Sequence, residues 1–312
     1  MDPVQHRGAG AAPLRAKLGV MADGLVLTRR ISERGVHDWA QRAVDPLSAG
    51  AVREYVGYEE WIGDDFLRRE VARCGVALIL AFGDELDVHD GEVGPDPQRL
   101  QAFVVGNQSH ASMTGVTGHQ LGVQVEMTAA GALALLGDVE DYNDAVVALD
   151  DALGRDGIRI MEQLADAPTW ESRLDLLDGA FAAYDLPTLA PEVRWLRRQL
   201  VASQGQARVE PLMDETGWSR RHVTDRFRRQ LGITPKAYAR LLRFQRATDL
   251  LMEDRPGRSL ADVAIAAGYY DQSHLTRDFA ALAGMTPRTY AADAEAVPEV
   301  RFVQDLEELA PA

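Results

Sequence analysis

Cysteine, long apolar runs and leader segments are scarce or absent in this chain of 312 residues. Cys74 is the single cysteine, which excludes an intrachain disulfide and argues against a cysteine-based zinc site. A lone thiol is more often a small buried apolar group than a nucleophile. No stretch approaches the roughly 18 apolar residues of a membrane-spanning helix, and no signal sequence opens the chain. These absences predict a soluble, cytoplasmic protein with no membrane partner.

Sequence motifs of catalysis are missing as well. The chain has no glycine-rich phosphate loop, no Gly-x-Ser-x-Gly elbow and no paired-carboxylate motif. The N-terminal histidines form no His-x-His pair and have no nearby glutamate that completes a metal-ligand set. They are His37, His89, His110 and His119. We therefore expect no enzyme activity, no metal and no cofactor.

Charge is distributed unevenly along the chain. Residues 193–292 contain 17 Lys+Arg and 10 Asp+Glu, a net charge of +7, which leaves −22 for the remainder of the −15 total. An acidic protein with a pI near 4.9 is a poor general ligand for nucleic acid, because phosphate neutralisation drives non-specific affinity. A basic module in an acidic chain still presents a basic face, so the segregation favours DNA binding by the C-terminal third.

This C-terminal third contains one pattern twice. Phe227 and Phe279, 52 residues apart, each lie on an apolar stripe of helical spacing. The glycine and the proline that follow them keep the same offset of 52, as Gly232 and Gly284 and as Pro235 and Pro287. The glycine that precedes each copy, Gly217 or Gly268, is offset by 51. The first glycine of each copy fits a sharp turn and the second a left-handed helix end. Two short helices that meet at a glycine turn are typical of the helix-turn-helix, whose second helix enters the major groove.

The spacer between the copies predicts one long helix from residue 235 to about 254, with proline at its first position. About twenty residues extend roughly 30 Å at 1.5 Å per residue. A turn of B-DNA is about 34 Å, so the spacer suits two recognition helices in successive major grooves. One chain would then do what a dimer of single helix-turn-helix units usually does.

Residues 193–292 resemble the DNA-binding domain of the AraC/XylS family of transcription regulators. The second copy carries the resemblance most closely, in residues 261–279 (ADVAIAAGYYDQSHLTRDF) and 284–290 (GMTPRTY). The resemblance implies an all-α domain of two helix-turn-helix units, an N-terminal sensor or dimerisation domain, and RNA polymerase as a partner. Ala280, Ala281 and Ala291 depart from the family pattern, which commonly has basic residues there.

The N-terminal part predicts an α+β domain. Strand signals over residues 25–28, 76–82, 103–105 and 121–126 alternate with turn signals, which favours a small β-barrel or sandwich. The family resemblance adds a cupin-like sensor barrel. Helices are expected over residues 128–137, 143–153, 158–165 and 169–184, and the last has an apolar stripe that suits either a dimer contact or an internal core. We divide the chain into a mobile tail (1–18), a sensor/dimerisation domain (19–188), the double helix-turn-helix domain (191–292) and an acidic tail (293–312).

Two sets of side chains are candidates for DNA contact. Those expected to touch base edges face away from the apolar stripe or occupy matched positions in the second copy: Arg220, Arg221, Thr224, Asp225, Gln272, Ser273, Thr276 and Arg277. Arginine can bind guanine with two hydrogen bonds, glutamine can bind adenine, and threonine can meet a thymine methyl. Those expected to bind phosphate, and so to position the protein without reading sequence, are Arg226, Arg228, Arg229, Lys236, Arg240 and Arg243.

The sequence thus predicts a sequence-specific transcription regulator that binds double-stranded DNA, responds to a small-molecule effector and can form a homodimer. The aromatic residues Trp39, Tyr55, Tyr58 and Trp61 fit either a ligand pocket or, more commonly, a core. Two alternatives remain open. A cupin-type metalloenzyme fused to a DNA-binding module would contain stoichiometric metal, and a ligand-free architectural DNA binder would show no effect of small molecules on DNA affinity.

Overall fold

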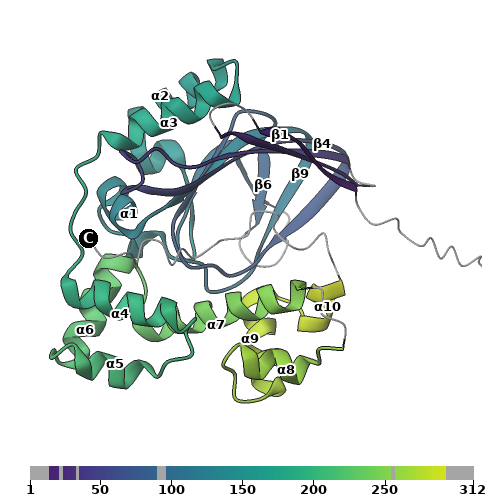
Figure 1. Cartoon of the computed structure of the whole chain (residues 1–312). Helices are drawn as coiled ribbons and strands as arrows, with labels where there is room; N and C mark the ends of the chain where they lie inside the picture. The colour runs from purple at the N-terminus through teal and green to yellow at the C-terminus, as the bar shows by residue number, and fades with distance from the viewer. Residues whose placement is uncertain (1–13, 21–23, 33–34, 90–95, 254–256, 293–312) are drawn as a thin grey trace, which may run out of the picture.

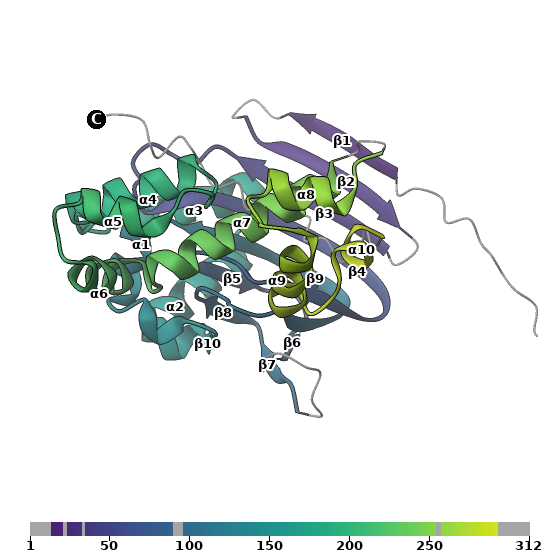
Figure 2. The same ribbon diagram turned by 90° about the horizontal axis from the view of Figure 1, so that it is seen from below.

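The computed structural model describes residues 14–20, 24–32, 35–89, 96–253 and 257–292. A curved sheet with flanking helices forms the N-terminal part, and helices alone form the described C-terminal part (Figure 1). The C-terminal helices lie together across one side of the sheet (Figure 2). Residues 1–13 of the expected mobile tail and the whole expected acidic tail, 293–312, lie outside the described residues.

Within the described residues the sheet contains ten strands, each antiparallel to its neighbours. In chain order they are β1 (Leu14–Val20), β2 (Val26–Ser32), β3 (Gly35–Arg42), β4 (Val52–Glu70), β5 (Ala77–Ala81), β6 (Leu86–His89), β7 (Gln98–Leu100), β8 (Ala102–Val105), β9 (Ser112–Met127) and β10 (Val146–Ala148). The pairing path runs β1-β2-β3-β4-β9-β5-β8-β10, and β6 pairs with β9 and β7. Because no ladder joins β1 to β10 among the described strands, the sheet is open and the expected closed barrel is not formed. The chain instead passes from β10 directly into a helix that packs on the sheet.

The long central ladder joins β4 to β9, from Val52 opposite Met127 to Glu70 opposite Ser112. The sequence predicts only the end of β9, and it misses β3 and β4 altogether. Charged residues interrupt any apolar run in both strands, but β4 has paired neighbours on both sides that fix its conformation through backbone hydrogen bonds. β1 similarly begins at Leu14, inside the expected tail, because its backbone pairs with β2.

Three helices cover one face of the sheet: α1 (Ala129–Leu136), α2 (Leu149–Asp166) and α3 (Trp170–Ala182). The apolar stripe of α3 is internal, since Leu174 and Leu177 are fully buried in the same core as Tyr55. The helices expected over 143–153 and 158–165 are wrong in part. Residues 146–148 pair with β8 as a strand, and one helix, α2, follows with a kink at Gly154, where φ is 57°. Two adjacent valines favour the strand, and glycine tolerates the positive φ.

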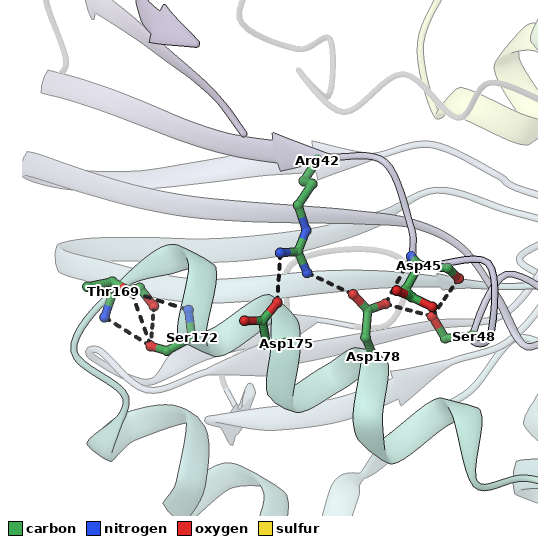
Figure 3. A network of polar contacts seen from close by, with 7 residues as sticks. All are labelled: Arg42, Asp45, Ser48, Thr169, Ser172, Asp175 and Asp178. Atoms are coloured by element: carbon green, nitrogen blue, oxygen red, sulfur yellow. Dashed lines mark hydrogen bonds and ion pairs between the residues drawn. The ribbon is translucent and has the colours of Figure 1, made fainter. Parts of the chain in front are cut away.

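A polar network fastens α3 to the sheet (Figure 3). Arg42, at the end of β3, donates to Asp175 at 2.8 Å and to Asp178 at 2.7 Å, both on α3. Asp178 also accepts from the Ser48 hydroxyl at 2.6 Å. Because Arg42 and Asp178 are largely buried, their charge-assisted bonds fix the direction of α3 more firmly than a surface ion pair would.

The C-terminal part confirms the predicted double helix-turn-helix. Its helices are α4 (Pro191–Ala202), α5 (Val209–Glu215), α6 (Arg220–Leu231), α7 (Pro235–Met252), α8 (Leu260–Ala266), α9 (Gln272–Ala283) and α10 (Pro287–Ala292). The turns between α5 and α6 and between α8 and α9 contain Gly217 and Gly268, with φ values of 75° and 83°. The long helix α7 supplies Tyr238 to the core of the first unit and Phe244 to the core of the second.

Candidate DNA-binding surface

The first recognition helix, α6, is defined by its caps and its buried stripe. The Ser219 side chain accepts from the His222 amide at the N-terminus, and Gly232 ends the helix in the left-handed conformation, with φ of 80°. Val223 and Phe227 are fully buried, and the Phe227 ring meets Tyr238 of α7 edge-on with 5.6 Å between centroids. The buried stripe therefore turns the opposite face of α6 toward solvent.

The second recognition helix, α9, follows the same plan and begins at Gln272. Asp271 accepts from the His274 amide at 2.7 Å, and Gly284 ends the helix with φ of 63°. Phe279 is fully buried, between Phe244 of α7 and Tyr290 of α10. The offset of 52 residues therefore reflects two structurally matched helices.

The residues predicted to contact bases lie on these two helices. Arg221 has a side chain 93% exposed, and its Nε lies 3.8 Å from Asp225, so Asp225 is placed to orient it. On α9 the matched candidates Gln272, Ser273 and Arg277 are exposed. Thr224 and Thr276, in contrast, are half-buried.

Arg220 has a pose that the sequence does not predict. Its guanidinium donates two hydrogen bonds to Asp214 of α5, at 2.8 and 2.6 Å. These bonds and the nearby carboxylate raise the pKa of Arg220 and lower that of Asp214. Arg220 thus joins the two helices of its own unit, and it would have to exchange partners to reach DNA.

Several residues predicted to bind phosphate are held by other parts of the protein. Arg240 pairs with the largely buried Asp278 of α9 at 2.9 Å, and Arg243 donates to the Gly205 carbonyl at 2.8 Å. These two arginines link α7 to neighbouring segments. Two other candidates form ion pairs: Lys236 with Glu210 at 2.7 Å and Arg228 with Glu140 at 3.3 Å. Arg229 donates to the Asp225 carbonyl of its own helix at 3.2 Å. Arg226 is half-buried.

A buried ionic cluster lies in the sheet. Glu60, 4% exposed, accepts from Arg68 at 2.7 Å and lies 3.3 Å from the His37 ring. Burial by itself opposes ionisation, but the Arg68 charge and the two hydrogen bonds lower the pKa of Glu60 to about 2. The carboxylate is therefore charged and paired at neutral pH.

The aromatic residues singled out in the sheet part differ in burial and in their neighbours. Trp39 and Tyr55 are buried, whereas Trp61 is exposed and stacks on His119 with 3.9 Å between centroids. Burial raises the pKa of the Cys74 thiol to about 12, so the thiol stays protonated near neutral pH.

Within the described ranges, no three His, Cys, Asp or Glu side chains group closely enough to hold a metal ion. None of the described helices has the length and apolarity needed to cross a membrane.

Comparison with known proteins places the C-terminal third. Residues 212–293 match the family model described as Helix-turn-helix domain. The uncharacterized HTH-type transcriptional regulator YbfI of Bacillus subtilis (strain 168) is 39% identical over 67 residues, which make up 22% of this chain. The match covers 23% of that protein, so the chain spans about a quarter of the length of this curated relative.

Two solved structures are similar to this chain at a lower sequence identity than that of YbfI. A probable AraC family transcriptional regulator from Rhodopseudomonas palustris CGA009 is 26% identical, with a TM-score of 0.30 over 35% of this chain and 100% of its own. Unsaturated fatty acid bound wild-type ToxT from Vibrio cholerae strain SCE256 is 12% identical, with a TM-score of 0.43 over 80% of this chain and 96% of its own.

Proposed function

We propose that this chain, whose residues 212–293 are a helix-turn-helix domain of the AraC type, is a sequence-specific DNA-binding transcription regulator. The observation that carries the proposal is the matched pair of recognition helices, α6 and α9, in a domain of net charge +7. Each helix has a buried aromatic hub and an exposed arginine, Arg221 on α6 and Arg277 on α9. Two such helices on one chain supply the contacts that a dimer of single units supplies elsewhere.

The proposed division of roles follows from exposure. Arg221, Gln272, Ser273 and Arg277 project from the helices and would read base edges, with Asp225 orienting Arg221. Thr224 and Thr276 would contribute where the helices approach the groove most closely. Arg220, and the phosphate-binding candidates that are now paired, would bind DNA only by exchanging their carboxylate or carbonyl partners for phosphate.

The rest of the chain is assigned by the same proposal. Residues 19–188 would form the sensor, a cupin-like open sheet that binds a small-molecule effector, and residues 191–292 the DNA-binding domain. A homodimer, RNA polymerase contact, and a cytoplasmic location are further parts of the proposal, and the apolar stripe of α3 is not the dimer contact because it is internal. The chain would act without enzymatic chemistry of its own.

Selection of duplexes from a random pool by the full chain tests the proposal. We expect enrichment of two short conserved blocks about 10 base pairs apart, one for each recognition helix. Enrichment without any sequence preference would favour the architectural DNA binder instead. Stoichiometric iron, zinc or manganese in the purified protein would favour the metalloenzyme alternative.

A further inference from the structure

The sheet part holds both recognition helices at the same structural position, their C-terminal ends. The last carbonyls of a helix have no partner within the helix, so they take donors from elsewhere. At the end of α6, Asn107 donates to the Leu231 carbonyl at 3.1 Å and Asn143 donates to the Gly232 carbonyl at 2.5 Å. At the end of α9, the Ala72 amide donates to the Leu282 carbonyl at 2.8 Å.

Asn107 is the centre of the first of these contacts. It is 3% exposed, and both its side-chain oxygen and its side-chain nitrogen form hydrogen bonds. Its Oδ1 accepts from the Gly75 amide at 2.9 Å, and its Nδ2 donates to Asn143 at 2.9 Å as well as to α6. The two asparagine side chains lie close to the backbone of Gly232, because a Cβ added to Gly232 would lie 2.6 Å from the Asn107 Nδ2 and 3.0 Å from the Asn143 Oδ1. A buried amide with all its bonds made costs free energy to displace, so this contact is a specific one.

One short piece of structure connects the two contacts. Arg73 and Gln108 form an antiparallel bridge, with backbone hydrogen bonds of 3.1 and 2.9 Å, between the segment that carries Ala72 and the segment that carries Asn107. We call these segments, residues 72–75 and 107–108, the crossbar. Cys74, in its middle, packs against the apolar cores of both helix-turn-helix units. One end of the crossbar therefore lies on α6 and the other on α9.

The crossbar adds a second anchor to each recognition helix. Helix α7 holds α6 near its middle through Tyr238 and Phe227, and it holds α9 through Phe244 and Phe279. A helix anchored at one point can pivot, whereas a second anchor at its end fixes its direction. The residues proposed to read bases, Arg221 and Gln272 among them, lie toward the other ends of the helices, so the crossbar does not cover them.

We propose that Asn107 and Asn143 are positioning residues which, with the crossbar, fix the spacing between the two recognition helices and thereby the half-site spacing that the protein accepts. The inference rests on the proposed function, since it presumes that α6 and α9 read DNA. It assigns to the sheet part a role in operator selection that is independent of any effector. Adding one base pair between half-sites moves the second by about 3.4 Å and turns it by about 34° around the duplex, which is a large error for a fixed pair of helices.

The test uses the full chain and the site obtained by selection, with one base pair inserted or removed between its two blocks. Fluorescence anisotropy gives the Kd for each length. For the unchanged protein we expect either change of length to raise the Kd about tenfold, equivalent to about 1.4 kcal/mol. For the double variant Asn107→Ala, Asn143→Ala we expect a rise of less than about threefold, because the helices can adjust their separation.

Two further variants make the result specific. Ser109→Ala removes a hydrogen bond to Asp144 of 2.8 Å in the same region without touching α6 or α9, and it should keep the tenfold penalty. Asn143→Ala alone removes the Gly232 contact and the Asn107–Asn143 hydrogen bond but leaves the Asn107 contacts to Leu231 and Gly75 in place. It should lower the penalty by about half, so it tests the proposal even where the double variant does not fold. Circular dichroism and thermal melting report on folding for each protein.

An unchanged length penalty in the folded double variant, or in Asn143→Ala, would show that α7 alone sets the spacing and would overturn the proposal. An equal decrease in the Kd of the double variant for sites of every spacer length would show that the asparagine contacts inhibit binding, and it would also overturn the proposal. The proposed function fails by a different result, a selection that enriches no sequence, and the spacing inference then falls with it.

Discussion

Arg228 of the first recognition helix lies 3.3 Å, from its Nε to the carboxylate oxygen, from Glu140 of the sheet part. Glu140 belongs to a short 3-10 helix, Glu140–Tyr142, that comes just before Asn143. The acidic N-terminal part thus engages an arginine that the sequence assigns to DNA phosphate. Both side chains are partly exposed, so the pair is weak enough for phosphate to compete with it.

Replacing Glu140 by glutamine should therefore strengthen non-specific DNA binding at low salt. Release of Arg228 adds up to one phosphate contact, which should lower the Kd about two- to threefold and steepen the slope of log K against log salt by up to about 0.9. The measurement is a salt titration on one random duplex. Glu162→Gln, an exposed change of the same charge on α2, is the control. The same gain in both variants would mean that net charge alone matters.

Arg221→Ala and Arg277→Ala should each reduce sequence discrimination. Each loss of a base-edge contact should cost about 1–3 kcal/mol on the selected site and relax the preference at one position, with little change on random DNA. Competition binding with single-base variants of the site measures both effects. Arg155→Ala, on the exposed surface of α2, should leave them unchanged. Uniform weakening on all sequences would reassign the two arginines to phosphate contact.

Phe227→Ala and Phe279→Ala should each destabilise their own helix-turn-helix unit. Both rings are fully buried, in separate apolar cores, so truncation should cost about 3–5 kcal/mol in the free energy of unfolding. Urea denaturation followed by circular dichroism gives the loss. Leucine at either position keeps most of the apolar volume and should cost less. Unchanged stability in an alanine variant would contradict the buried position of that ring.

The Glu60 cluster should make the stability of the sheet depend on pH in the acidic range. The folded protein lowers the pKa of Glu60 to about 2, below its unfolded value of about 4.3. Its contribution is therefore complete above pH 4.3 and is lost as pH falls toward 2, because the unfolded chain takes up the proton first. Glu60→Gln should cost about 2 kcal/mol at pH 7, because the half-buried Arg68 loses its charged hydrogen-bond partner. Denaturation at several pH values should show a smaller acid-induced loss in the variant, and an equal loss would assign the effect to other carboxylates.

The sequence predicts the helix-turn-helix units well because their signals are local. Gly232 ends the first recognition helix as its position predicts, Ser219 caps the start of that helix, and Ser259 and Asp262 form a capping box at the start of α8. A cap, a stripe and a glycine turn each depend on residues within a few positions of one another, and the second copy repeats them. The β3 and β4 strands have no such signal, since charged residues interrupt their apolar runs, and one partner of β4, the strand β9, lies far along the chain.

The sequence by itself determined that this protein contains two matched recognition helices, because helix ends and buried faces are encoded within about four residues. Only the tertiary structure decided which arginines are exposed on α6 and α9 and which are paired with distant segments. Arg221 is 93% exposed beside Asp225 of its own helix, whereas Arg228 and Arg240 meet carboxylates of Glu140 and Asp278 from other helices. Ion pairs and buried amides between distant segments leave no periodic pattern in a sequence, so the contacts that orient the two helices arise only once the chain has folded.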